Sequence, residues 1–206
     1  MGGGAEAASG GAEAVRADCG GTRKVVLLGP PGSGKGTQGA VLSQKLKVPA
    51  ISTGDMLREA VKAGSELGLK VDEIMRSGSL VDDGTMAEVV RERLARCGKG
   101  GGFLLDGYPR TIPQAETLSG ILTDAGDRLD AVLYVQVPEE ELVRRVVARM
   151  RGDDDREEVV RERLRIYREK TAPLIGYYRQ LGLLREVDGD RSVEQVTGQM
   201  LAALGV

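Results

Sequence analysis

Residues 24–37, KVVLLGPPGSGKGT, decide the fold class of this chain. The first five form a short apolar, β-branched run, which is typical of a buried strand. The following GPPGSGK matches the pattern G-x-x-x-x-G-K, and helical spacing continues from Thr37 to Leu46. A strand, a glycine-rich turn and a helix form the context of a phosphate-binding loop, because backbone N–H groups and a helix N-terminus then face an anion. We therefore predict that residues 29–37, here called the phosphate loop, bind a nucleotide, with Lys35 reaching its outer phosphates.

Outward from this loop, short apolar runs alternate with stretches of helical spacing. Further strands are expected at 50–52, 102–105, 131–137 and 183–187, and helices at 112–123, 139–149, 192–204 and from about 157, with an interruption near Pro173. Residues 55–94 have helical spacing that Gly64, Gly68 and the region of Gly78 should break. This alternation predicts an α/β fold with a mainly parallel sheet. The helices between 52 and 81 and the acidic break near Asp154 are expected to be excursions from that core.

Composition excludes several classes of function. The 206 residues include no histidine, so no mechanism can rest on a histidine base, nucleophile or metal ligand. The two cysteines, Cys19 and Cys97, are too few for a four-thiolate zinc site and indicate no disulfide framework, so we expect no zinc and a reducing, cytoplasmic location. A net charge of −2 and 3% aromatic residues argue against nucleic acid as a partner.

The distribution of apolar residues bears on membranes, assembly and the N-terminal segment. No window of about 18 apolar residues predicts a membrane span, and without an evident apolar stripe a monomer is expected. Residues 1–22 are rich in glycine and lack the apolar core of a secretory signal. We expect a disordered tail at 1–22, followed by a single domain over 23–206.

The loop departs from the general pattern at one position. A serine or threonine usually follows the lysine and holds Mg²⁺, but here Gly36 intervenes and Thr37 comes one residue later. Asp106 ends the third apolar run, where a carboxylate from the neighbouring strand would face the loop. The metal must therefore be held in another way, and Asp106 is the candidate.

Four motifs together resemble those of the adenylate kinases in order and spacing. They are GPPGSGKGTQ at 29–38, STGDMLR at 52–58, GFLLDGYPRTIPQAE at 102–116 and TAPLIGYY at 171–178. The resemblance covers about residues 24–204. It implies a P-loop fold in which helices flank a five-stranded parallel sheet, with a helical AMP-binding excursion at 52–81 and a short lid at 149–157. It also implies reversible phosphoryl transfer from MgATP to AMP, which gives two ADP and serves adenine nucleotide homeostasis.

The resemblance further implies roles for individual residues. Asp106 is expected to hold Mg²⁺, the cofactor, through water. The expected catalytic residues are Lys35, Asp106, Arg110, Arg149, Arg151 and Arg163. The residues expected at ATP are Gly32, Ser33, Gly34, Lys35, Gly36, Thr37, Arg149 and Arg191. Those expected at AMP are Thr53, Arg58, Ser79, Leu80, Val81, Gly107, Tyr108, Pro109, Arg110, Gln114, Arg151 and Arg163.

The lid departs most from the family pattern. Only RMRGDDDREE, residues 149–158, lies between two helices, which resembles the shortest lids of the family. Three consecutive aspartates stand where the family has a pair. Counting back from Arg163 favours Asp154 and Asp155 as that pair, whereas counting forward from Arg151 gives Asp153 and Asp154.

Phosphoryl transfer suits a chain without histidine. The attacking group is a phosphate oxygen of AMP, which is largely dianionic at pH 7, so no general base is required. Catalysis then rests on alignment and charge neutralisation. One alternative is a UMP/CMP-type kinase, but those relatives usually have asparagine after the Pro-Arg pair, where this chain has Thr111. The other, a non-catalytic nucleotide-binding module, would have lost Lys35, Asp106 or the lid arginines.

Overall fold

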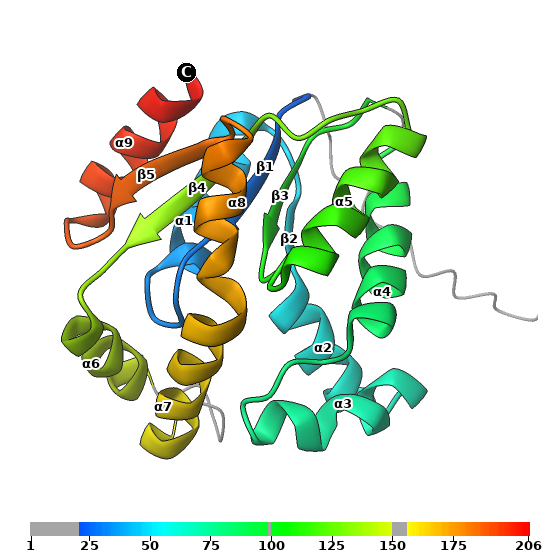
Figure 1. The fold of residues 1–206 in the computed structure, drawn as a ribbon, viewed down its shortest axis with the longest axis vertical. Coiled ribbons are helices and arrows are strands. Elements are labelled where there is room, and N and C mark those ends of the chain that lie inside the picture. Colours follow the sequence, from blue (N-terminus) through cyan, green and yellow to red (C-terminus); the bar gives the residue numbers. More distant parts are fainter. Residues whose placement is uncertain (1–20, 99, 150–155) are drawn as a thin grey trace, which may run out of the picture.

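A five-stranded parallel sheet forms the centre of the molecule (Figure 1). The computed structural model describes residues 21–98, 100–149 and 156–206. The strands are β1 (Lys24–Leu28), β2 (Ala50–Ser52), β3 (Phe103–Asp106), β4 (Ala131–Gln136) and β5 (Leu184–Asp188), in the spatial order β2-β3-β1-β4-β5. Neighbouring strands pair in parallel throughout. The predicted α/β class and sheet are confirmed, and every strand begins and ends within one residue of its expected place.

Helices cover both faces of the sheet. They are α1 (Lys35–Leu46), α2 (Thr53–Lys62), α3 (Glu66–Arg76), α4 (Asp83–Ala95), α5 (Ile112–Asp124), α6 (Glu139–Arg149), α7 (Glu157–Ile166), α8 (Pro173–Gln180) and α9 (Val193–Leu204). Strand β1 alternates between the faces: Val25 and Leu27 pack with α1 and α9, whereas Val26 and Leu28 pack with α4, α5 and α8. Burial on both sides explains why β1, β3 and β4 are nearly continuous apolar runs, whereas the edge strand β5 carries exposed Arg185 and Glu186.

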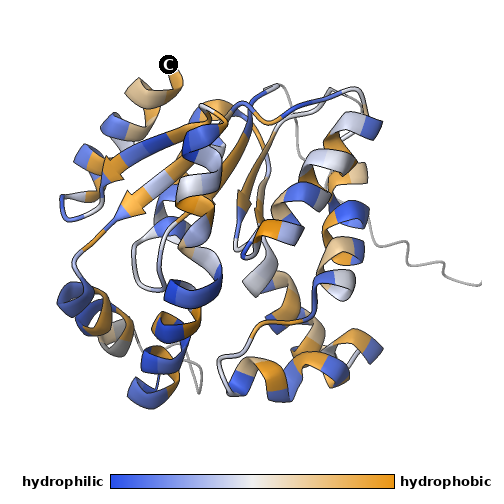
Figure 2. Ribbon diagram, in the orientation of Figure 1, coloured by the Kyte–Doolittle hydropathy of each residue, from blue (hydrophilic) through white to orange (hydrophobic). Residues whose placement is uncertain are grey.

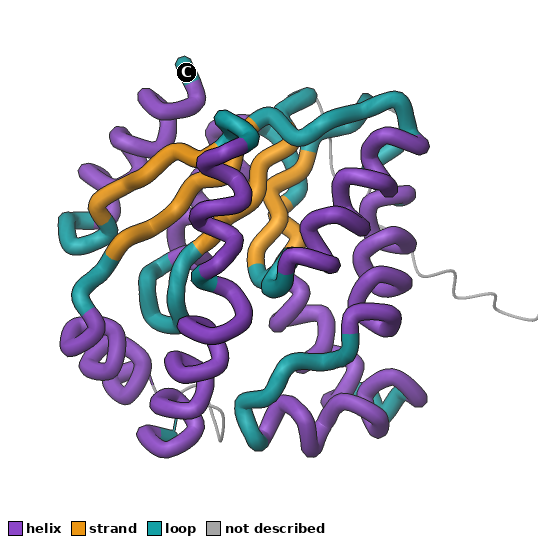
Figure 3. Tube along the Cα trace, viewed as in Figure 1, coloured by secondary structure: helices purple, strands orange, loops and turns teal. Residues whose placement is uncertain are grey.

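Helices α6 and α7 lie beyond the carboxyl edge of the sheet, as Figure 1 shows. They bury a narrow apolar stripe against each other, made of Leu142, Val146, Val160 and Leu164. Most of their remaining surface is hydrophilic (Figure 2). The loops after β1 and β3 leave the sheet at this same edge (Figure 3), because parallel strands end on the same side. This edge is where a site built from several strand ends can form.

Two features of the helices differ from expectation. Helix α1 begins at Lys35, two residues before the expected Thr37, so the lysine already belongs to its first turn. Gly64 and Gly78 follow the ends of α2 and α3 with φ of 62° and 78°, but Gly68 does not break the chain and lies inside α3. It is glycine because α3 approaches α2 closely: a Cβ at residue 68 would be 2.1 Å from the Ala60 carbonyl oxygen.

The interruption expected near Pro173 takes the form of a π-helical turn, Tyr167–Thr171, between α7 and α8. The Ala172 N–H donates to the Tyr167 carbonyl at 2.8 Å. Proline has no N–H to continue a ladder, but it suits the first position of a new helix, where α8 begins. The wider turn therefore joins two helices across a residue that an α-helix cannot contain.

Gly68→Ala is expected to destabilise the fold, because the new methyl would meet the backbone of α2 rather than a movable side chain. We expect a loss of about 1–3 kcal/mol in the free energy of unfolding, typical of overpacking. The matched control is Gly120→Ala in α5, where a Cβ meets nothing within 4 Å. That change should stabilise by up to about 1 kcal/mol. Urea unfolding of both variants measures the difference, and equal effects would refute the packing role of Gly68.

No helix in the described part of the chain combines the length and apolarity that crossing a membrane requires. Of the expected tail, residues 1–20 lie outside the described range. Gly21 donates its N–H to the Lys47 carbonyl at 3.0 Å and accepts from the Gly102 N–H at 3.0 Å. The chain thus joins the core from Gly21 onward.

Candidate active site

The phosphate loop connects β1 to α1 and packs against α6. Gly32 and Gly34 have φ of 84° and 90°, a region that side chains rarely tolerate. A Cβ on Gly32 would be 2.6 Å from Val146 Cγ2 and 2.8 Å from the Leu142 carbonyl oxygen. Residue 32 must therefore be glycine for two reasons: its φ is positive, and α6 leaves no room for a Cβ. Helix α6 is seated directly on the loop.

The Lys35 ammonium is held within the loop. Its Nζ donates to the carbonyls of Gly29 at 2.8 Å and Pro30 at 2.9 Å, and it lies 3.4 Å from Ser33 Oγ. These partners fix a positive charge at the start of α1, where the helix dipole also favours an anion. Ser33 itself is buried.

Asp106 faces the loop from the adjacent strand. In the register of β1 and β3, Leu27 lies beside Asp106, so the carboxylate stands at the edge where the loop begins. A Cβ on Gly36 would lie 4.0 Å from Asp106 Oδ2. The position where other phosphate loops carry a hydroxyl thus points at this carboxylate across an open space.

This arrangement fits Mg²⁺ held through water. Mg²⁺ usually keeps several waters and binds one or two carboxylates together with substrate phosphates. Within the described residues no three His, Cys, Asp or Glu side chains gather as a metal cage. One carboxylate opposite a phosphate loop, with a glycine leaving room between them, suits a hydrated ion rather than a fully protein-bound one.

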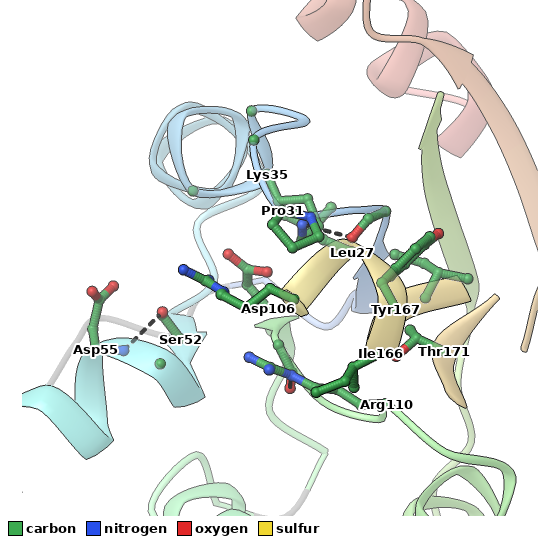
Figure 4. A pocket seen from close by; sticks show the side chains of 18 of the residues that line it. Leu27, Pro31, Lys35, Ser52, Asp55, Asp106, Arg110, Ile166, Tyr167 and Thr171 are labelled. Carbon is green, nitrogen blue, oxygen red and sulfur yellow. Dashed lines mark hydrogen bonds between the residues drawn. The ribbon is translucent and has the colours of Figure 1, made fainter. Parts of the chain in front are cut away.

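A cavity of about 340 Å³ opens at this edge of the sheet. In Figure 4 the side chains of Lys35, Asp106 and Arg110 surround it, with Tyr167 and Thr171 on one side and Ser52 and Asp55 on the other. The expected site residues in its lining are Gly32, Gly34, Lys35, Gly36, Thr37, Arg58, Leu80, Asp106, Gly107, Pro109, Arg110 and Arg163.

A smaller cavity of about 60 Å³ adjoins the first. The two share Gly54, Arg58, Gly78, Leu80, Gly107, Arg110 and Arg163 in their linings. The smaller one adds further expected residues, namely Thr53, Ser79, Val81 and Gln114. Residues from three segments that are distant in the sequence therefore meet at one composite pocket.

Three guanidinium groups converge where the cavities meet. Arg110 follows β3, Arg163 lies on α7 and Arg58 lies on α2, and all three line both cavities. Burial, and then the like charge of Arg163, lower the pKa of Arg110 to about 10, with Arg58 adding to the effect and Asp106 opposing it. Like charges brought together in this way favour a shared anion, and phosphate is the anion that guanidinium binds in bidentate fashion.

Local contacts fix the direction of each arginine. Arg110 Nε donates to the Gly107 carbonyl at 2.8 Å. Gly107 has a φ of 85°, and a Cβ there would be 2.5 Å from Thr53 Oγ1. Arg58 pairs with Asp55 at 2.5 Å, in the helix that Ser52 caps. The turn after β3 and the start of α2 are thus packed together, and this packing brings Arg110 and Arg58 to one place.

Gln114, on α5, is buried, and each end of its side-chain amide makes one hydrogen bond to the protein. Its Oε1 accepts from the Arg110 N–H at 2.7 Å, and its Nε2 donates to Asp83 Oδ1 at 2.7 Å. Thr111 caps the same helix and also donates to Asp83, at 3.3 Å. Thr53 is buried and donates to the Asp106 carbonyl at 3.3 Å.

Some expected residues do not reach the described cavities. The Tyr108 ring packs into the core, where burial raises the pKa of its hydroxyl to about 12, and Tyr108 is absent from the linings of both cavities. Arg191 pairs with Asp188 at 2.8 Å and is absent from both linings. Arg149 ends α6, but its side chain is not described, and Arg151, Asp153, Asp154 and Asp155 lie outside the described residues.

The structure adds residues that the motifs did not single out. Arg145 lines the larger cavity and bonds to the Gly189 carbonyl at 3.0 Å and to Asp190 at 3.1 Å. The sequence could have indicated Arg145, because it lies one helical turn before Arg149 and therefore on the same face of the helix. Tyr167, together with Thr171 at the start of the TAPLIGYY motif, lines the same cavity from the π-helical turn, and no local pattern marks such a turn. Asp83 had no signal either, because its partners lie about thirty residues away.

Comparison with known proteins gives one consistent family. The family model described as adenylate kinase matches residues 27–183. The chain is 49% identical over 184 residues to an adenylate kinase of Thermobifida fusca, covering 88% of this chain and 97% of the relative. It is 48% identical over 185 residues to one of Thermus thermophilus, with coverage of 88% and 97%.

A third relative differs in length. An adenylate kinase of Syntrophotalea carbinolica is 44% identical over 212 aligned residues, covering 88% of this chain and 98% of the relative. That alignment is longer than the whole chain of 206 residues, so this relative contains residues that the present chain lacks. The shorter relatives and this longer one each match 88% of the present chain.

Proposed function

This chain belongs to the adenylate kinase family, and we propose that the composite pocket is where it transfers a phosphoryl group between ATP and AMP. The reaction is reversible and converts ATP and AMP into two ADP. The observation that carries the proposal is that Lys35, Asp106 and three arginines from separate segments line a single cavity. This is the charge pattern that phosphoryl transfer requires at its reacting centre.

We assign the phosphate loop to ATP. The loop residues Gly32, Ser33, Gly34, Lys35, Gly36 and Thr37 would surround its phosphates, with Arg149 and Arg191 on the same side. The positive φ values of Gly32 and Gly34 and the start of α1 support this assignment, since both direct N–H groups toward an anion.

We assign the smaller cavity and its surroundings to AMP. Arg58, Arg110 and Arg163 would hold its phosphate, and Arg151 would join them from the lid. The base would lie near Thr53 and Gln114, bordered by Ser79, Leu80 and Val81 and by the backbone of Gly107, Tyr108 and Pro109. In this division 52–81 is the AMP-binding excursion and 149–157 the short lid. The extra length of the Syntrophotalea carbinolica relative is compatible with a shorter lid here.

The chain's own residues perform the chemistry by position and charge. A phosphate oxygen of AMP attacks the terminal phosphorus of ATP, the bond to the bridging oxygen breaks, and ADP leaves. The oxygen needs no base, since the phosphate is largely dianionic at pH 7. Lys35, Arg110, Arg149, Arg151 and Arg163 would align the two nucleotides and neutralise the charge of the transferring group. Asp154 and Asp155 are the acidic residues that we assign to the lid.

The family uses MgATP, and we assign Asp106 as the residue that holds Mg²⁺ through water. When bound, the ion would neutralise phosphate charge. We also propose a monomer in the cytoplasm, with ATP, AMP and ADP as its partners and without nucleic acid, membrane or structural zinc. Among the described residues the large exposed hydrophobic side chains, Leu69, Ile112, Leu181, Val193 and Val206, are scattered along the chain.

The test of the proposal is acceptor preference. Purified chain is incubated with MgATP and, separately, AMP, GMP, UMP or CMP, and diphosphate formation is followed. AMP should be strongly preferred, because a polar base site leaves groups unpaired when the wrong base enters. Equal turnover with UMP or CMP would overturn the assignment of the base site.

Asp106→Asn is expected to weaken the use of Mg²⁺. The change removes a charge while keeping the shape of the side chain, so the half-saturating Mg²⁺ concentration should rise by at least about tenfold, the value of one charged hydrogen bond. Initial rates over a Mg²⁺ titration measure this. The control is Asp124→Asn, an exposed aspartate at the end of α5, which should leave the titration unchanged. An unaltered titration in Asp106→Asn would refute this assignment.

A further inference from the structure

The side-chain amide of Gln114 is held from two sides by groups of opposite character. Its oxygen accepts from the Arg110 N–H at 2.7 Å, and its nitrogen donates to Asp83 Oδ1 at 2.7 Å. A backbone N–H can only donate, and a carboxylate can only accept. The two partners therefore permit one orientation of the amide.

Reversing this amide would break both contacts at once. The NH₂ group would then face the Arg110 N–H, and the oxygen would face the Asp83 carboxylate. Gln114 is only 2% exposed, so water could not compensate for either mismatch. The orientation is consequently fixed by residues around the side chain, before any ligand is present.

The fixed orientation determines what the smaller cavity offers to a base. An amide has two N–H bonds and two lone pairs on its oxygen, so one of each remains after the contacts with Asp83 and Arg110. Gln114 lines this cavity together with Thr53. Adenine carries an amino donor at position 6 and an acceptor at N1, whereas hypoxanthine and guanine carry a carbonyl acceptor and an N–H donor there. Reading the 6-oxo pattern with the same amide would require the reversed orientation.

We propose that Asp83 is a specificity-determining residue, which selects a 6-aminopurine over a 6-oxopurine by fixing the orientation of Gln114. It is a positioning residue, because it acts through Gln114 and is absent from the linings of both cavities. The proposal rests on the proposed function in one respect, that the acceptor base occupies the smaller cavity.

The place of Asp83 in the fold explains how a surface residue can fix the orientation of a buried amide. It is the first residue of α4, directly after the cap Asp82, and α4 packs beside α5. Besides Gln114 it accepts from Thr111 Oγ1, the cap of α5, at 3.3 Å. The carboxylate thus connects the starts of two neighbouring helices and is anchored relative to the amide that it orients.

The experiment compares AMP with IMP as acceptors for wild type and Asp83→Asn. IMP differs from AMP only at the N1 and C6 edge, so size and sugar contacts are matched. Asparagine can offer either an oxygen or an NH₂ group to Gln114, so one of the two constraints disappears. We expect the ratio of kcat/KM for AMP to that for IMP to fall by about tenfold, the value of one hydrogen bond. The change should appear mainly in KM, with kcat nearly constant.

The matched control is Asp82→Asn. It removes a carboxylate from the adjacent residue of the same helix start, and Asp82 contacts the Thr85 N–H rather than Gln114. Asparagine caps helices as well as aspartate does. The AMP-to-IMP ratio should therefore stay at the wild-type value.

A double-mutant cycle separates the outcomes. In a Gln114→Leu background Asp83→Asn should no longer alter the ratio, because its effect passes through the amide. An unchanged ratio in Asp83→Asn, an equal change in the leucine background, or a parallel loss with both nucleotides would overturn the role of Asp83. If Gln114→Leu alone leaves the ratio unaltered, the assignment of the acceptor base to the smaller cavity is wrong instead. Should Asp83→Asn fold poorly, Asp83→Ser is carried through the same cycle.

Discussion

Replacing Lys35 with alanine is expected to lower kcat by at least about 100-fold while the fold is retained. The loss corresponds to one preorganised charged contact with the transferring group. The fold should survive, because the loop shape depends on glycine φ values and on packing of Gly32 against α6. Steady-state kinetics with saturating MgATP and AMP measure the effect, and urea unfolding checks stability.

The matched control for this variant is Lys45→Ala. Lys45 lies in the last turn of the same helix and is exposed, so its loss removes an equal charge from α1 at the end far from the loop. Its kcat should stay near wild type. Near-normal turnover in a correctly folded Lys35→Ala variant would refute the assignment of the phosphate loop to ATP.

The sheet and the phosphate loop could be predicted because their signals are local. Five apolar runs fix five strands, and the glycine pattern after β1 specifies a turn whose backbone only glycine adopts readily. The expected place of Asp106 opposite the loop came from the general pattern of phosphate-loop proteins, and the sheet places it there because β3 lies beside β1. Structure that a short segment determines by itself, such as a strand or the phosphate loop, could therefore be predicted from the sequence.

The features that were missed depend on contacts between distant segments. Gly68 is a glycine because α2 lies against it, so reading it as a helix breaker was wrong. The π-helical turn that directs Tyr167 into the cavity arises where two helices meet at a proline. Gln114 was expected at AMP, and only the fold reveals that Asp83 and Arg110 already use half of the hydrogen-bonding capacity of its amide. Tertiary partners, rather than local propensity, determine these properties.

Arg110→Ala is expected to have the largest effect of any substitution in the described residues, a fall in kcat of about 10³-fold. An arginine that stabilises phosphoryl transfer contributes at least this much. Arg110 lines both cavities and would lie between the two nucleotides, where burial and Arg163 lower its pKa to about 10. A bound phosphate would relieve that repulsion, so the charge is stabilised most when substrate is present.

Two further variants refine this test. Arg110→Lys shows whether the effect depends on the charge or on the shape of the side chain, and Arg58→Ala shows what loss of ground-state binding alone does to the kinetics. Arg110→Lys keeps the charge but loses the planar fork that binds phosphate in bidentate fashion, so most of the loss should persist. Arg58→Ala should instead raise the KM for AMP more than it lowers kcat, because Arg58 lies on α2, in the proposed AMP-binding excursion. The control Arg144→Ala removes an exposed charge that pairs with Glu141 and should change neither constant.

The pattern across these variants, measured by steady-state kinetics, tests the assignment of the pocket. A large loss of kcat in Arg110→Ala together with a KM effect in Arg58→Ala means that the anion bound by Arg110 is the one being transferred or attacked. Equal KM effects in both, with kcat preserved, would contradict this and reduce Arg110 to a ground-state binding residue. In that case the charge that stabilises transfer would have to come from Lys35, from Arg163 and from the arginines that we assign to the lid.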